Sequence, residues 1–333
     1  MKNLPNLFLF NLFLLAILIL ATRLATFLHE FMGHALMAAT FGGDVNGVRI
    51  SLFGGGEVYY HLKMQSGLYV RFLAAFGGIL VNMLSGLLPF IFMRRLKNKP
   101  VWALFLALFG MVSLLGAIAY SSLGFYYQVG DPVAWIKGPP EREGWFFIPF
   151  LAVSPFVSYF AVKSYSILNE RWFPSKTFRN RTKMMALTLG IAGCAYAGLY
   201  GLTGQRLMAV DAPILAFQRA EREVRKIKTE ALYRKLCETR PELSDDGIRR
   251  LVEQTPIVII PDEVPKKFPL PPVIAILYTA GALLALWRTK GGMPGSIIRI
   301  SPRSVFFSAA LAGAILGLLA WTGGWVLPMS NLD

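Results

Sequence analysis

Long apolar runs dominate the pattern of hydrophobic and polar positions along the chain. A transmembrane helix needs about 20 consecutive apolar residues, and repeated runs of that length are typical of proteins that cross a membrane several times. Six of these runs cover residues 7–39, 68–92, 101–123, 145–168, 272–287 and 305–327. Another, the fifth along the chain, ends near residue 204. The pattern predicts an all-α polytopic membrane protein with about seven transmembrane helices.

The first run is too long for a single untilted crossing, because a helix rises about 1.5 Å per residue. No Gly or Pro lies at Ala21, Thr22 and Arg23, where a break would divide the run into two elements. Gly and Pro are the residues that most often interrupt a helix. We therefore expect one long helix over residues 4–42.

Two β-prone segments follow this helix, at residues 48–52 and 58–62. They flank a glycine cluster at residues 54–56, an arrangement typical of a β-hairpin. A strand with unpaired backbone groups can hold an extended peptide by strand addition. The sequence leaves open whether this hairpin binds a peptide or only connects two spans.

The one substantial polar segment covers residues 205–268. Apolar positions at helical spacing predict an amphipathic helix over residues 213–240, and Ser244 is placed to cap a second helix. We expect three parts: a membrane core of five spans with the hairpin and the Asp131 loop (residues 1–204), an extracytoplasmic helical insert (205–268), and two C-terminal transmembrane helices (269–333).

The distribution of charge along the chain indicates how the protein is oriented in the membrane. The formal net charge is +15, and the basic residues cluster in the short loops at residues 94–99, 171–183 and 288–303, which alternate with neutral loops. Basic loops stay in the cytoplasm. We expect a multi-pass protein of a cell membrane with a cytoplasmic N-terminus and an outer C-terminus. Because the loops account for the excess of Lys and Arg, nucleic-acid binding is excluded.

Three ionisable residues cluster within six positions of the first apolar run: His29, Glu30 and His34. Ionisable groups within a membrane helix are costly, so they mark a functional site unless they are simply paired. Their types match the His-Glu-x-x-His zinc motif, in which two His bind the metal and the Glu moves protons, but the spacing is one residue longer. The alternative is a set of satisfied polar groups near the lipid headgroups.

The longer spacing has a geometric consequence. Residues at i and i+4 lie about 40° apart around a helix, whereas residues at i and i+5 lie about 140° apart. A π-bulge absorbs one extra residue and would make His29 and His34 converge, and Gly33 has no Cβ to oppose it. A metal site therefore requires a widened turn between the two histidines.

Further candidate groups come from other segments. The loop topology places Asp131 on the same membrane side as the histidines, as a third metal ligand. Asn82, in the second span, could stabilise an oxyanion or bind the substrate backbone, or could form only an interhelical hydrogen bond. Glu57 and His61, in the hairpin, are possible accessory residues.

These segments resemble the site-2 protease family of intramembrane zinc metalloproteases. The resemblance lies in residues 29–34 (His-Glu-Phe-Met-Gly-His), 77–82 (Gly-Gly-Ile-Leu-Val-Asn) and 130–132 (Gly-Asp-Pro), and in a hairpin after the motif helix. The first motif is one residue longer than the family pattern, the second lacks its Pro and is also longer, and the third is not Leu-Asp-Gly. The lengthened first motif is similar to that of the soluble dipeptidyl peptidase III family.

The leading hypothesis is zinc-dependent hydrolysis of a peptide bond in or near a membrane-embedded segment of a protein or peptide. Zn²⁺ would be bound by His29, His34 and Asp131, and Glu30 would accept a proton from the attacking water. One alternative is a membrane transporter or scaffold that uses the same buried His, Glu and Asp cluster. Another is an inactive relative of the proteases.

Overall fold

The computed structural model describes residues 4–63, 66–96, 99–134, 143–174, 177–203, 208–257, 270–289 and 301–327. Within these residues, seven helical runs are long and apolar enough to cross a membrane, which confirms the predicted fold class. The first run joins α1 (Leu4–Phe27), a π-helix η1 (Leu28–Ala35) and α2 (Leu36–Thr40) without a break. The prediction of one long first helix is therefore confirmed.

The remaining spans follow the predicted apolar runs closely. Of the next five spans, four are single helices and one combines α7 (Phe178–Met185), a π-helix η4 (Ala186–Gly190) and α8 (Ile191–Leu202), and short helices connect some of them. The single helices are α3 (Leu68–Phe92), α4 (Pro100–Tyr127), α6 (Phe147–Asn169) and α11 (Leu270–Arg288). The last span is α12 (Pro302–Trp321), and the short helices are η2 (Met93–Leu96), α5 (Asp131–Ala134) and η3 (Glu143–Phe146).

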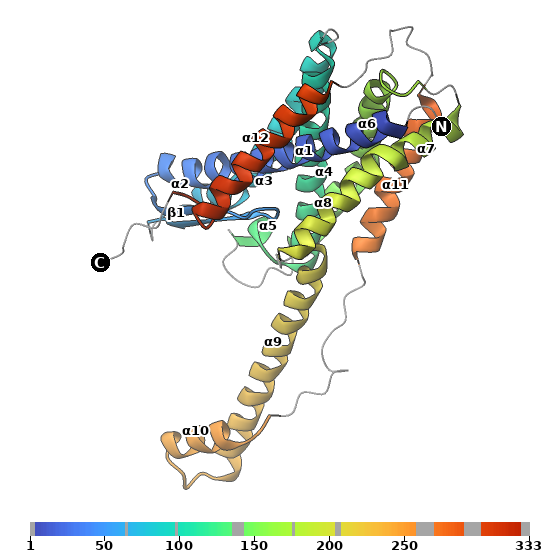
Figure 1. Ribbon diagram of the computed structural model, residues 1–333. Helices are drawn as coiled ribbons and strands as arrows, with labels where there is room; N and C mark the ends of the chain where they lie inside the picture. The colour runs from blue at the N-terminus through green and yellow to red at the C-terminus, as the bar shows by residue number, and fades with distance from the viewer. Residues whose placement is uncertain are drawn as a thin grey trace. The chain divides into compact units, whose positions relative to one another are not determined.

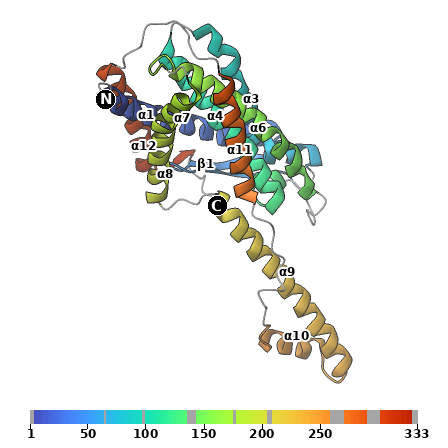
Figure 2. The same ribbon diagram turned by 90° about the vertical axis from the view of Figure 1, so that its right-hand side faces the viewer.

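Helix α4 lies in the centre of the membrane unit and contacts α1, α3 and α6 (Figure 1). Apolar side chains of α1 pack against it, with Phe13 and Leu14 fully buried beside Leu104 and Leu108 of α4. Helix α12, red in Figure 1, crosses α1 and contacts it, and Figure 2 shows the same helices turned by 90°. The helix that carries the histidines is thus held on several faces.

A small antiparallel sheet follows α2 and confirms the predicted hairpin. Its strands are β1 (Asp44–Ile50), β2 (Gly56–His61) and β3 (Trp325–Leu327), in the order β2-β1-β3. Val48 of β1 pairs with Val58 of β2 on one side and with Leu327 of β3 on the other.

The third strand corrects the prediction for the C-terminal apolar run. Helix α12 ends at Trp321, and a turn with positive φ at Gly323 and Gly324 leads into β3. Glycine adopts this backbone conformation without steric cost. The segment Trp325–Leu327 was included in the last span because its side chains are apolar, but strand pairing decides its structure. This pairing places the end of α12 on the same side as the hairpin.

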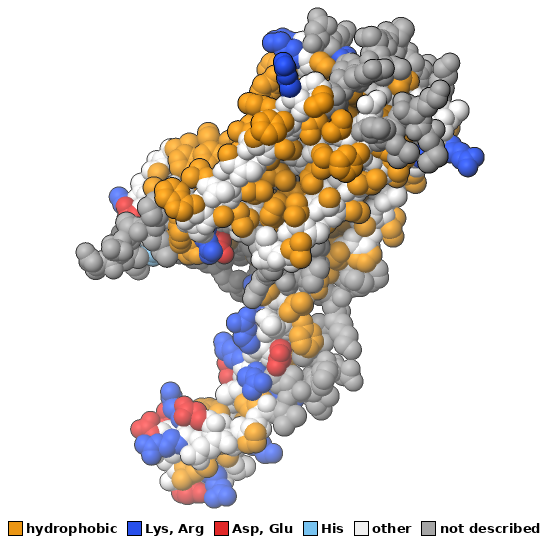
Figure 3. All heavy atoms as spheres, viewed as in Figure 1, with side chains coloured by type: hydrophobic (Ala, Val, Ile, Leu, Met, Phe, Trp, Pro, Cys, Tyr) orange, Lys and Arg blue, Asp and Glu red, His pale blue; other side chains and the backbone are white. Residues whose placement is uncertain are grey.

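The chain divides into two compact units, one comprising residues 1–207 and 270–333 and the other residues 208–269. The second unit contains α9 (Met208–Thr239) and α10 (Asp245–Gln254), so both helices predicted for the polar segment are present. The Ser244 hydroxyl accepts the Gly247 N–H at 3.3 Å and caps α10 as expected. Figure 3 shows hydrophobic side chains over the helices of the first unit, whereas charged side chains gather over α9 and α10.

Candidate metal centre

The turn that carries both histidines is a π-helix, η1, as the sequence spacing required. The wider turn brings the Nε2 atoms of His29 and His34 to 3.2 Å from each other. Gly33 lies within this turn, where a Cβ atom would approach the backbone N of Gly78 in α3 to 2.5 Å. The predicted widening is therefore confirmed, and the glycine also permits close contact between η1 and α3.

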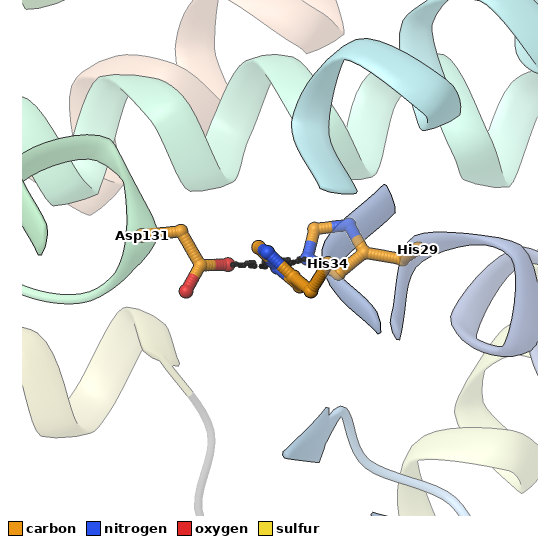
Figure 4. A group of neighbouring side chains, drawn as sticks. All are labelled: His29, His34 and Asp131. Atoms are coloured by element: carbon orange, nitrogen blue, oxygen red, sulfur yellow. Dashed lines mark hydrogen bonds and ion pairs between the residues drawn. The ribbon is translucent and has the colours of Figure 1, made fainter. Parts of the chain in front are cut away.

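Asp131 reaches the histidines from a turn that follows α4. Gln128 ends the helix in the left-handed conformation, and Gly130 has a positive φ of 71°. This reversal places Asp131 at the start of α5, with Oδ2 at 3.1 Å from the Nε2 atoms of both His29 and His34. Figure 4 shows the carboxylate and the two imidazoles pointing toward one another.

The three donor atoms form a nearly equilateral triangle with sides of 3.1, 3.1 and 3.2 Å. Zinc binds His nitrogen and carboxylate oxygen at about 2.0–2.2 Å in a tetrahedron, which separates neighbouring ligand atoms by roughly 3.3–3.5 Å. Within the described residues, this is the one group of His, Cys, Asp or Glu side chains found close enough to share an ion. The donor set fits zinc.

Gly78 keeps space open beside these donor atoms. A Cβ atom at this position would lie 2.5 Å from Nε2 of His29 and 2.6 Å from Nε2 of His34. A methyl group there would occupy the space next to both nitrogens. The glycine is therefore required by the close packing of both imidazoles against α3, and it leaves the space beside their nitrogens open to an ion.

Each imidazole is fixed by a partner on its other nitrogen. His34 donates from Nδ1 to the carbonyl oxygen of Ala74 at 2.7 Å, which leaves Nε2 as a lone-pair donor. His29 Nδ1 lies 3.1 Å from the side-chain nitrogen of Asn82, while Asn82 Oδ1 is buried without a partner among the described residues. Amide nitrogen and oxygen are assigned by such networks, and turning the amide over lets Oδ1 accept the His29 N–H. Both Nε2 atoms then face Asp131 with lone pairs that could bind a metal ion.

The Asp131 carboxylate is suited to stay ionised. Burial raises the pKa of Asp131, but while the two imidazoles carry protons on Nε2, the hydrogen bonds and charges of His29 and His34 outweigh this effect and hold the pKa below its ordinary value. Opposite charges and hydrogen bonds to a carboxylate favour its charged form. Asp131 therefore offers an anionic oxygen where the two imidazole nitrogens meet.

Glu30 is buried beside the histidines and contacts the hairpin. It accepts a hydrogen bond from the backbone of Gly56, and a Cβ atom at residue 56 would lie 2.5 Å from Glu30 Cγ. Its relative exposure is 6%, yet it borders the same cavity as the histidines. A carboxylate in this position can exchange a proton with a molecule bound in the cavity.

The cavity has a volume of about 680 Å³ and opens beside the three donor atoms. One wall is strand β2, which lies at the edge of the sheet and has β1 as its one paired neighbour among the described strands. Glu57 lines the cavity and accepts a hydrogen bond from Tyr59 at 2.7 Å. His61 is outside the cavity lining and pairs with Asn46 at 2.8 Å instead. The hairpin thus brings Glu57, but not His61, to the site.

Tyr120 of α4, which no sequence pattern indicated, also lines the cavity. Its hydroxyl accepts the backbone N–H of Asp131 at 3.2 Å, and its ring meets the His29 ring edge to face with centroids 6.1 Å apart. A tyrosine within an apolar span carries no metal-binding pattern. Its proximity to Asp131 depends on how the chain turns after α4.

Residues 6–162 match the family model described as Peptidase M50B-like. The comparisons with curated proteins and with solved structures gave no match. The matched segment contains all the residues that line the cavity.

Proposed function

The chain belongs, through residues 6–162, to the M50B-like peptidases of the site-2 protease family, and we propose on this premise that it is an intramembrane zinc metalloprotease. The observation that supports this proposal most directly is the triangle formed by His29, His34 and Asp131. Its substrate would be a peptide bond in or near a membrane-embedded segment, because the histidines lie within a continuous span, Asn6–Thr40.

His29, His34 and Asp131 would hold the zinc ion, with Asn82 and the Ala74 carbonyl fixing the two rings. When bound, zinc supplies Lewis acidity, which lowers the pKa of water and polarises a carbonyl group. Glu30 would accept the proton of the attacking water and return it to the leaving amine. The Gly56 N–H orients the Glu30 carboxylate for both transfers.

The substrate backbone would lie along β2. This strand borders the cavity and stands at the edge of the sheet, so its outer backbone groups can pair with an extended peptide. Asn82 also lines the cavity and would donate from its amide to the substrate carbonyl or to the developing oxyanion. The backbone of β2 and the side-chain amide of Asn82 would thus hold the bond to be cleaved near Glu30.

The test separates metal binding from catalysis in the purified full chain. Zinc content is measured by elemental analysis, and cleavage is measured with a fluorogenic transmembrane peptide in liposomes. The unmodified protein is expected to hold one zinc ion, His34→Ala to lose it, and Glu30→Gln to retain it while losing cleavage. His61→Ala is the matched control, because this histidine lies outside the cavity and should leave zinc and cleavage unchanged.

Retained cleavage in Glu30→Gln would exclude the proposed mechanism. Zinc binding without cleavage of any membrane peptide would support an inactive relative of the proteases. A protein without zinc that carries a pH-dependent ion flux would support the transporter hypothesis.

A further inference from the structure

A second buried charge lies in the first span, and the proposed chemistry does not use it. Arg23 belongs to α1, and its relative exposure is 5%. It lies two turns before the histidines in a helix whose other residues from Leu4 to Phe27 carry no charge. A charged group in a membrane helix is costly and persists where its partners and function compensate for it.

The partners of Arg23 are backbone carbonyl groups of the turn between β1 and β2. Its NH1 donates to the carbonyl of Ser51, and its NH2 lies 2.9 Å from the carbonyl oxygen of Phe53 and 2.8 Å from that of Gly54. A guanidinium offers several donors in a fixed planar fork, which suits three carbonyl groups that converge from one turn.

A second membrane helix holds the same turn. The Tyr196 hydroxyl of α8 accepts from Arg23 NH2 at 3.2 Å and donates to the Phe53 carbonyl at 2.8 Å. The Tyr196 and Phe53 rings also meet edge to face, with centroids 5.8 Å apart. The turn is therefore fixed to both α1 and α8.

This turn leads directly into the wall of the cavity. Gly55 follows it, Gly56 donates its N–H to Glu30, and the rest of β2 borders the cavity as far as Tyr60. A Cβ atom at residue 56 would overlap Glu30, so the strand and the carboxylate are already in close contact. A displacement of the turn would move this wall away from Glu30.

We propose that Arg23, with Tyr196, is a positioning residue that holds the hairpin against the cavity and keeps the Gly56 N–H on Glu30. The effect on cleavage rests on the proposed function. The effect on the hairpin does not, because it concerns hydrogen bonds that exist without substrate or metal. The two parts of the proposal can therefore be measured separately.

The position of the hairpin is measured with a spin label on the full chain in lipid nanodiscs. The label is attached through Gly55→Cys, since a Cβ atom there meets nothing within 4 Å, after Cys194→Ser and Cys237→Ser remove the native thiols. Arg23→Gln is expected to add a mobile component to the spectrum. Tyr196→Phe should shift it in the same direction by a smaller amount.

The matched control is Arg49→Gln. Arg49 is an exposed residue of β1 whose Nε donates to the Gly323 carbonyl at 3.2 Å, so the same charge and the same kind of bond are lost on the same sheet. The spectrum at residue 55 should stay unchanged in this variant. Arg23→Lys, which retains the charge but loses the planar fork, should give an intermediate spectrum.

Zinc content and cleavage complete the test. Arg23→Gln should retain stoichiometric zinc while kcat falls between about 10-fold and 100-fold, the range expected when a reacting group is displaced by about 1 Å. An unchanged spectrum in Arg23→Gln, or a loss of zinc as complete as in His34→Ala, would overturn the proposal. If Arg23→Gln does not fold, the Tyr196→Phe variant decides, and an unchanged spectrum in that variant would overturn the proposal. If the unmodified protein neither binds zinc nor cleaves, the spectra alone decide.

Discussion

Gly78 lies directly against His29: a Cβ atom at residue 78 would approach the His29 Nε2 atom to 2.5 Å. The same atom would lie 2.6 Å from His34 Nε2. Residue 78 thus limits what can stand beside both donor nitrogens. The contact itself is one of packing between α3 and η1, and the Gly78→Ala variant tests whether it also governs metal binding.

Gly78→Ala should lower zinc affinity by more than about 100-fold, beyond the range for changes to the partners of metal ligands. The added methyl group would take the space next to both nitrogens. Zinc affinity is measured by competition with a chelator. Gly116→Ala is the control, because Gly116 also lines the cavity but a Cβ atom there meets nothing within 4 Å.

Asn82→Ala should weaken zinc binding by about 10-fold to 100-fold, because the His29 ring would lose the partner that fixes its orientation and proton position. Asn46→Ala removes a similar amide from His61, outside the cavity, and should leave zinc affinity unchanged. Equal zinc affinity in both variants would contradict an orienting role for Asn82.

Tyr120→Phe should lower zinc affinity by about 10-fold, since the Asp131 N–H loses its acceptor and the carboxylate is held less firmly. Tyr127→Phe is a matched control on the same helix. The Tyr127 hydroxyl accepts the Leu270 N–H at the same 3.2 Å distance, but Tyr127 does not line the cavity. The prediction fails if competition with a chelator gives the two variants the same zinc affinity.

Gly33→Ala should destabilise the folded protein by about 1–3 kcal/mol or more, because the new methyl group would overlap the backbone of α3 at Gly78. Thermal unfolding in detergent measures the change. Gly198→Ala in α8, where a Cβ atom meets nothing within 4 Å, should be close to neutral. Similar unfolding temperatures for the two variants would show that η1 and α3 can separate without cost.

Much of the fold follows from local properties of the sequence. Apolar runs predicted the seven spans because membrane helices satisfy their backbone hydrogen bonds internally and need only sufficient length. The lengthened spacing of His29 and His34 predicted the π-helix for an equally local reason. Strand β3 was missed, because an apolar tripeptide after a span gives no local sign of pairing with a strand far away in sequence.

The candidate site also combines features that the sequence predicted with features that depend on tertiary packing. The sequence by itself determined that two histidines and a glutamate share one turn of a membrane helix, and it offered Asp131 and Asn82 as partners from other segments. The tertiary structure decided that Asp131 lies 3.1 Å from both rings, that Asn82 faces His29, and that Tyr120 and Arg23 hold the surrounding elements. Spacing within one helix fixes relative direction through the helical repeat, whereas contacts between distant segments depend on how whole helices pack.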